Sequence, residues 1–204
     1  MYAIITDGSI SRYVNHPRPL VIGDVQYPAR IFSAWTASEL AAIGIIKVTF
    51  DNSNKKEEQW YINTNQTYTY DASAGTVTAT YGTATAKAHA DTLFTAQDET
   101  DGLGTEGEIK TEGLKTILIR KVKAQAEQLL NQTDWYITRK AEKNTAIPSA
   151  ITTWRDGIRT KQAAMETSIT NASDTPALET LYTYTTDSEG VQSRPLGEFP
   201  ELGS

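Results

Sequence analysis

The chain has 204 residues and a formal net charge of -6 at pH 7, with 39% hydrophobic and 22% charged residues. This length is enough for one large domain or two small ones, each with an ordinary hydrophobic core. The chain contains no cysteine, which excludes disulfides, thiolate metal sites and cysteine nucleophiles. Its negative charge repels the phosphate backbone, so we expect no nucleic-acid partner. The longest apolar run, residues 40–46, is far shorter than a membrane span, and the first residues lack the basic start of a secretory signal. We therefore expect synthesis in the cytoplasm and no membrane association.

The first half of the chain has the pattern of an antiparallel β domain with one short helix. Asp7-Gly8 lies between two apolar-alternating runs, and this dipeptide favours the type I′ turn of a hairpin. Thr36 and Glu39 have the spacing of a capping box, which predicts a short helix that Gly44 ends. The expected strands cover residues 1–6, 9–14, 25–35 with a break at Pro28, 45–50, 59–70 and 76–81. Residues 84–96 have a weak helical pattern, and we place the end of the β-rich domain at residue 96.

Residues 97–113 are acidic and rich in glycine, which predicts a linker between two domains. One alternative is a calcium loop that starts at Gln97 and places Glu99, Asp101 and Glu108 at ligand positions, with Gly102 at the sharp turn. The glycine spacing of residues 102–107 also matches a dinucleotide-binding motif on paper. Its acidic surroundings repel a diphosphate, so we expect no cofactor.

The second half of the chain predicts an antiparallel helical hairpin over residues 114–175, followed by an extended tail over 176–204. Apolar residues recur at three- and four-residue steps in two stretches, and Pro148 is placed to start the second helix. The first stripe comprises Leu114, Ile117, Leu118, Val122, Ala126, Leu129 and Leu130, and the second comprises Ile151, Trp154, Ile158, Met165 and Ile169. These apolar stripes have to be covered, so we expect the two helices to pack on each other or against another chain. If the other chain is a second copy, the protein is a homo-oligomer.

The sequence contains no assembled catalytic motif, so we expect a protein that is not an enzyme. Its two histidines, His16 and His89, are far apart and have no base or ligand partner at helical spacing. Tryptophan and arginine dominate binding hot spots, and this predicts partner-binding roles for a set of residues in the hairpin. The set is Trp135, Tyr136, Trp154, Arg155 and Arg159. Trp135 and Trp154 have an alternative role, which is to pack the two helices together. Asp134 is placed to cap a helix or to pair with Arg139 or Arg155.

Four segments of the second half carry a resemblance to a known family. They are residues 126–130, Asp134-Trp135, Ile147-Pro148 and residues 154–159. Together they resemble the C-terminal part of tail-fibre assembly proteins of tailed bacteriophages and of related small phage tail-associated virion proteins. The first 50 residues are loosely similar to the β-rich starts of such proteins.

The resemblance implies a non-enzymatic role in which the helical module docks on a tail or tail-fibre protein. Trp135, Trp154, Arg155 and Arg159 are the matched positions. Such a protein would act in the host cytoplasm during assembly or become part of the virion tail. Residues 64–85 and 97–113 match nothing in the family, so the resemblance leaves both roles open, an assembly factor and a structural subunit.

A second class of function uses the aromatic residues of the β half. Ring faces on a sheet can stack on sugars, and this predicts a carbohydrate-binding module as the alternative to the docking role, beside calcium binding by the acidic loop. The candidate rings are Trp60, Tyr61, Tyr68, Tyr70 and Tyr81. Cross-strand packing accounts for the same residues equally well.

Overall fold

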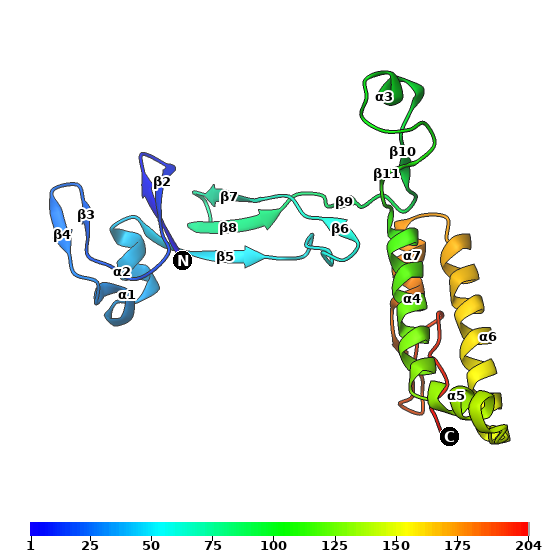
Figure 1. Ribbon diagram of the computed structural model, residues 1–204. Helices are drawn as coiled ribbons and strands as arrows, with labels where there is room; N and C mark the ends of the chain where they lie inside the picture. The colour runs from blue at the N-terminus through cyan, green and yellow to red at the C-terminus, as the bar shows by residue number, and fades with distance from the viewer. Residues whose placement is uncertain (204) are drawn as a thin grey trace. The chain divides into compact units, whose positions relative to one another are not determined.

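The computed structural model describes residues 1–203 and confirms the predicted α+β class, with strands in the first half and helices in the second (Figure 1). The chain forms two units, Met1–Thr85 and the part that begins at Ala86. The predicted boundary within 97–113 is therefore wrong. Residues that precede it are bonded to the first helix of the second unit: the amide of Leu114 donates to the carbonyl of Ala88 at 3.0 Å, and the amide of Gly113 donates to Asp91 Oδ1 at 2.6 Å.

The first unit is built on a five-stranded sheet with the strand order β2-β1-β5-β8-β7. Its strands are β1 (Tyr2–Thr6), β2 (Ser9–Val14), β5 (Ile45–Asp51), β7 (Gln66–Asp71) and β8 (Thr76–Tyr81). The β1–β2 hairpin is confirmed, with φ values of 51° at Asp7 and 75° at Gly8 as the type I′ turn requires. We expected an antiparallel sheet, and this is wrong for one pair, since β5 and β8 are parallel. The chain reverses in a tight turn between β7 and β8, and β8 then runs alongside β5 in the same direction.

One core cluster of the first unit lies between the sheet and two short helices. The elements around it are β3 (Leu20–Ile22), β4 (Val25–Tyr27), α1 (Ile31–Ala34) and α2 (Ala37–Ala42). The capping box of Thr36 and Glu39 is confirmed at the start of α2. The strand expected over 25–35 ends at Tyr27. Ile31 and Phe32 are adjacent and both buried, which a helical turn permits and a strand, with its alternating side chains, does not.

The sheet of the first unit is curled, and its second core cluster lies on the inner face. Ala3, Val48, Val77 and Ala79 are buried there. Tyr13 of the edge strand β2 and Tyr68 of the opposite edge strand β7 meet with their ring centroids 4.7 Å apart. The strand expected over 59–70 is split into β6 (Tyr61–Ile62) and β7, with Trp60 buried just before β6.

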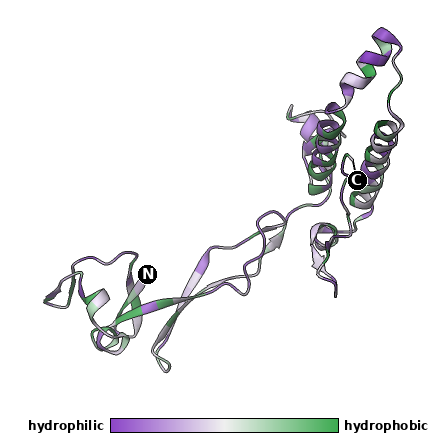
Figure 2. Ribbon diagram, turned by 90° about the horizontal axis from the view of Figure 1, so that it is seen from below, coloured by the Kyte–Doolittle hydropathy of each residue, from purple (hydrophilic) through white to green (hydrophobic). Residues whose placement is uncertain are grey.

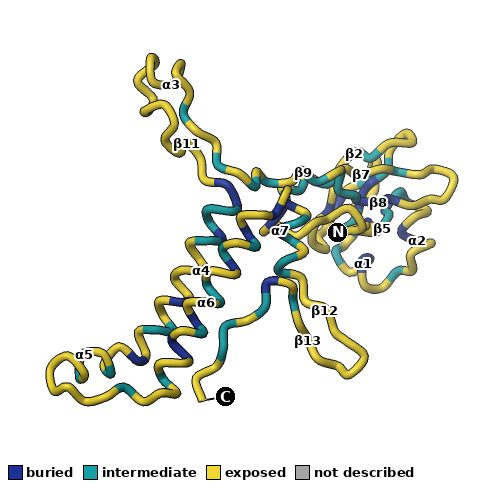
Figure 3. Tube along the Cα trace, turned by 90° about the vertical axis from the view of Figure 1, so that its right-hand side faces the viewer, coloured by how far each residue is buried: buried dark blue, intermediate teal, exposed yellow. Residues whose placement is uncertain are grey.

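The second unit begins with a projecting arm in place of the expected helix and linker. The arm contains β10 (Thr92–Leu93), α3 (Ala96–Thr100) and β11 (Ile109–Thr111), and β9 (Thr85–Ala86) precedes it. Thr95 and Asp98 form a capping box on α3, and Lys110 Nζ lies 2.6 Å from Asp98 Oδ1. The acidic segment is therefore held by local hydrogen bonds, although nearly all of it is exposed (Figure 3).

The helical hairpin is confirmed, with α4 (Leu114–Asn131) packed on α6 (Ser149–Asn171). The buried residues of α4 are Leu114, Leu118, Val122 and Ala126, whereas Ile117, Leu129 and Leu130 are half-buried. Those of α6 include Trp154, Ile158, Met165 and Ile169. Figure 2 shows the resulting alternation of apolar and polar residues along both helices. Pro148 directly precedes α6, as the sequence predicts.

Two segments of the second unit differ from the expectation. The connection between the hairpin helices contains a separate helix, α5 (Asp134–Lys143). The tail expected to be extended contains α7 (Thr175–Tyr182) and the strand pair β12 (Thr185–Thr186) and β13 (Gln192–Ser193). Leu178 and Leu196 are buried, so this tail is anchored by apolar contacts that lie too far apart in sequence to show as a helical or strand period.

Candidate protein-docking site

The junction between α4 and α5 is held from inside by Arg155 of α6. This side chain is buried, with only 7% of the residue exposed. Its Nη1 donates to the carbonyl oxygen of Leu130 at 2.8 Å and to the buried hydroxyl of Thr133 at 2.7 Å, and it lies 2.8 Å from Asp134 Oδ1. Arg155 thereby adds a charged donor to a carbonyl at the end of α4 that also accepts from the amide and the hydroxyl of Thr133, and it fixes the first residue of α5.

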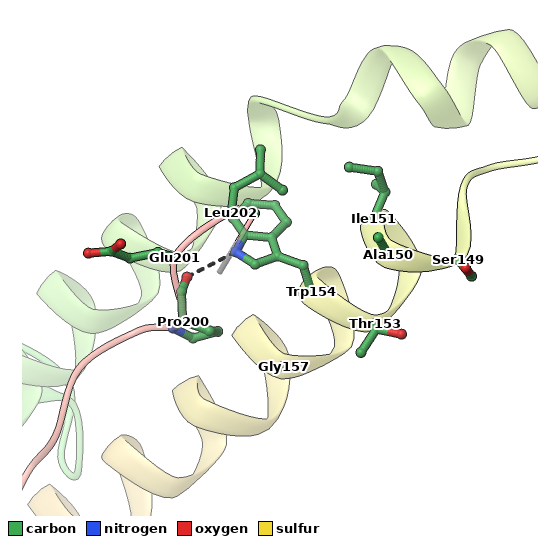
Figure 4. A pocket seen from close by; sticks show the side chains of 10 residues that line it. Ser149, Ala150, Ile151, Thr153, Trp154, Gly157, Pro200, Glu201 and Leu202 are labelled. Atoms are coloured by element: carbon green, nitrogen blue, oxygen red, sulfur yellow. Dashed lines mark hydrogen bonds between the residues drawn. The ribbon is translucent and has the colours of Figure 1, made fainter.

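Trp154 is also buried and holds the C-terminal segment against α6. Its indole N–H donates to the carbonyl oxygen of Pro200 at 2.9 Å (Figure 4). Its ring packs with Ala126 and Ile158. A groove of about 690 Å³ lies beside it, between the first turns of α6 and the segment that follows Pro200. Figure 4 shows Leu202 next to the indole ring, so the chain itself covers this tryptophan.

The exposed face of α5 carries a stacked group of three side chains, Trp135, Tyr136 and Arg139, which we call the α5 aromatic cluster. The ring centroids of Trp135 and Tyr136 lie 3.8 Å apart. The Arg139 guanidinium lies 4.7 Å from the first ring centroid and 5.1 Å from the second, which is a cation–π arrangement. Trp135 is 52% exposed, and none of the ten residues of α5, all of which the structure describes, is buried.

On a chain with a net charge of -6, α5 carries three basic residues and two acidic ones, Asp134 and Glu142. Lys140 and Lys143 lie in its last turn, where a cation interacts favourably with the helix dipole. Arg139 adds a third positive charge, and Asp134 is already paired with Arg155. The Nε atom of Arg139 is buried and has no hydrogen-bond partner among the described residues. The α5 surface therefore combines exposed aromatic area with positive charge.

The structure places the five residues predicted to bind a partner in two environments. Trp135 and Tyr136 are at the surface of α5, as a docking role requires. Trp154 and Arg155 are buried, and their polar atoms are bonded within the second unit, which corrects their assignment to partner binding. They face inward because the apolar stripe of α6 includes position 154, and because Arg155 reaches the Leu130 carbonyl at the end of α4. Arg159 is exposed, and its Nη1 pairs with Asp156 Oδ1 at 3.1 Å.

Sequence reasoning missed Arg139 as a member of the site. The signal was present, because Arg139 follows Tyr136 by three residues and Trp135 by four, and such positions are neighbours on a helix. Once α5 is recognised as a helix, this spacing predicts the cluster. Of the two arginines that the sequence offers to Asp134, Arg155 is the one that forms the ion pair.

The carboxylates of the acidic arm are used in local contacts. Asp98 accepts hydrogen bonds from Lys110 and Thr95, which lower its pKa to about 2, with the Lys110 bond as the largest cause. Glu99 accepts from the amide of Glu106, and Asp101 accepts from Gln97. Across residues 1–203, no group of three or more acidic or histidine side chains is placed to hold a metal ion. The calcium hypothesis thus gains no support from this geometry.

The aromatic residues of the first unit contribute mainly to packing. Trp60 is buried, Tyr68 packs on Tyr13, and Tyr70 packs against the inner core cluster. The ammonium of Lys55 lies 5.8 Å from the ring centroid of Tyr81. Four of the five candidate rings thus make contacts within the first unit, and the carbohydrate hypothesis gains no support from them.

Comparisons with known proteins give no family for this chain. No protein-family model matches it, and no curated protein or solved structure is significantly similar to it. Among the helices of residues 1–203, none has both the length and the apolar character needed to cross a membrane.

Proposed function

We propose that this chain is a non-enzymatic protein that binds another protein through the α5 aromatic cluster, and that its partner is a bacteriophage tail or tail-fibre protein. The observation that carries the proposal is the stack of exposed Trp135 and half-buried Tyr136 under Arg139. Tryptophan, tyrosine and arginine are the residue types most enriched in binding hot spots. On α5 they form one preorganised surface.

The energetics of α5 favour a covered state. A helix of ten residues is marginal in water without packing, and α5 buries none of its described residues. Covering the exposed half of Trp135 removes roughly 100 Å² of apolar surface. At about 25 cal/mol per Å² this contributes about 2.5 kcal/mol before ordering costs. The Arg155 anchor already orders the start of α5, which lowers the entropy lost on binding.

The charge of α5 indicates the kind of surface it fits. Arg139, Lys140 and Lys143 favour a partner patch with acidic side chains around an apolar centre. The resemblance of residues 126–159 to tail-fibre assembly proteins supports a tail or fibre protein as that partner. Peptide mapping of purified particles separates the two roles, since a structural subunit is present in many copies and an assembly factor is missing.

The direct test is a binding measurement with the tail and tail-fibre proteins of the same phage. Trp135→Ala should weaken binding by at least tenfold and leave the thermal melt unchanged, because this ring packs on the surface of α5. Ile137→Ala is the matched control, since Ile137 is 43% exposed on the same helix and lies outside the cluster. Equal binding by the wild type and Trp135→Ala, or no binding to any tail or fibre protein, would overturn the proposal.

A further inference from the structure

The edge strand β7 of the first unit has none of the usual features that block pairing with another strand. Its six residues, Gln-Thr-Tyr-Thr-Tyr-Asp, contain no proline or lysine, and Asp71 at the end is the only charged one. All six pair with β8 without a register shift. Within the part of the chain that the structure describes, β7 has a strand neighbour on one side only. Unpaired edges of this kind are templates for a further strand.

The opposite edge, β2, is protected in two ways. The register of its pairing with β1 shifts between Ile4 and Ile5, and such a bulge twists an edge away from a flat partner. The guanidinium of Arg12 in β2 donates to the carbonyl oxygen of Val21, which draws this charged side chain toward the β3 segment. The contrast between the two edges makes β7 the place where the sheet can grow.

We propose that β7 pairs antiparallel with β7 of a second copy of this chain, with Thr69 opposite Thr69 of the other copy. In an antiparallel ladder, the two opposite residues either both point their N–H and C=O groups at the partner strand or both point them away. These groups alternate along β7. Two copies can therefore pair only with odd-numbered residues opposite odd-numbered ones and even-numbered residues opposite even-numbered ones.

The packing of Tyr68 selects the register. Its ring contacts Tyr13, and its hydroxyl lies 3.9 Å from Met1 Sδ, so this side chain is committed to its own sheet. A register centred on Tyr68 sets two such rings against each other. Both registers pair five residues of each strand, but the one centred on Thr69 places a small exposed residue on the two-fold axis and sets each Tyr68 opposite Tyr70 of the other copy.

The side chains that meet in this register are compatible on both faces of the sheet. Tyr68 lies opposite Tyr70 on the inner face, and Thr67 lies opposite Asp71 on the outer face. The existing pair of β7 and β8 has similar outer contacts, with the hydroxyls of Thr67 and Thr80 3.5 Å apart. The two Asp71 carboxylates lie at opposite ends of the ladder, and each accepts hydrogen bonds from the amides of Ser73 and Ala74. No like charges stand opposite each other, so the charges of β7 are compatible with pairing to a second copy of the same strand.

Cysteine cross-linking tests both the pairing and its register, because the natural chain has no cysteine. In the full-length protein, Thr69→Cys should form a covalent dimer under mild oxidation, since opposite residues bring their Cβ atoms to roughly 5 Å. Thr67→Cys is the matched control on the same face of the same strand. In this register the two copies of residue 67 lie roughly 13 Å apart, so the control should stay monomeric. Equal cross-linking of both variants, or cross-linking of neither, overturns the proposal.

Sedimentation of the cysteine-free protein provides the second measurement. The wild type should form a concentration-dependent dimer, and Thr69→Lys should weaken it about tenfold by setting two ammonium groups opposite each other. Thr49→Lys is the control, because Thr49 is exposed on β5 inside the sheet. A wild type that stays monomeric at high concentration, or an equal loss in both variants, contradicts self-pairing. These results are independent of Trp135, so failure here is distinguishable from failure of the docking function.

Discussion

Arg155 on α6 and Asp134 on α5 form an ion pair of 2.8 Å between Nη1 and Oδ1, in which the guanidinium is buried and the carboxylate is half exposed. The same nitrogen is bonded to the Leu130 carbonyl and the Thr133 hydroxyl. One arginine therefore joins three helices at the point where the chain turns toward the α5 aromatic cluster. In the proposed docking function, Arg155 would act indirectly, by fixing the position of α5.

Arg155→Ala should destabilise the second unit by about 3 kcal/mol, because it removes a buried guanidinium that donates to the Thr133 hydroxyl and the Leu130 carbonyl and pairs with Asp134. Urea denaturation followed by circular dichroism measures this loss. Arg159→Ala, which removes an exposed arginine about one turn further along α6, should change stability by less than about 0.5 kcal/mol. Similar losses in the two variants would contradict the anchoring role of Arg155.

Trp154→Phe should loosen the C-terminal segment more than it unfolds the hairpin. The variant keeps a ring in the core but loses the hydrogen bond from the indole to Pro200, which contributes about 1 kcal/mol. Amide exchange should therefore accelerate around residues 199–202, with little change in the middle of α4. Trp135→Phe is the control and should leave this segment as it is. Unchanged exchange in Trp154→Phe would show that the segment is held by other contacts.

The acidic arm should respond to pH through Asp98. The bond from Lys110, followed by those from Thr95, lowers the folded-state pKa to about 2, below the unfolded value of about 3.9. Because the folded pKa is the lower one, the ionised carboxylate stabilises the arm above the unfolded pKa. This contribution is lost as the pH falls from about 4 to about 2. The chemical shift of the Thr95 amide, followed by NMR as the pH is lowered, reports the protonation of Asp98. Lys110→Gln should raise the midpoint toward the ordinary value, and an unmoved midpoint would contradict the assigned cause.

Gly44→Ala should destabilise the first unit by about 2 kcal/mol. Gly44 has a φ of +79°, and a Cβ there would lie 2.7 Å from the carbonyl oxygen of Ile5. Gly75→Ala is the control, because Gly75 has a φ of +63° but open space around it. It should lose only about 1 kcal/mol. Thermal melts of both variants separate the cost of the positive φ, which both share, from the cost of the contact with Ile5. Equal losses of stability would mean that the contact with Ile5 relaxes freely.

Short-range patterns predicted those parts of the fold that depend on neighbouring residues. The Asp7-Gly8 turn, the Thr36–Glu39 capping box and the periodic stripes of α4 and α6 all appear where the sequence places them. Each depends on residues within four positions of one another or on a repeated period, and the relevant physics is local turn geometry and one-sided burial.

The errors have two causes. The acidic segment 97–113 has the composition of a linker, yet Thr95 and Asp98 form a local capping box that starts α3, and Asp98 pairs with Lys110 twelve positions away. The tail after residue 176 has few apolar residues, yet Leu178 and Leu196 anchor it. A sequence pattern does not show which distant groups will meet, so ordered segments of this kind resemble loops.

By itself the sequence determined the α+β class, the helical hairpin and the presence of an aromatic, arginine-containing segment at its turn. Only the fold separated Trp154 and Arg155, which are buried, from Trp135, which is exposed, and Tyr136, which is half-buried. The physical reason is that residue type makes tryptophan and arginine equally suited to a core and to an interface. The choice between the two depends on which side of α6 or α5 faces α4, and this is set by packing between residues more than 20 positions apart.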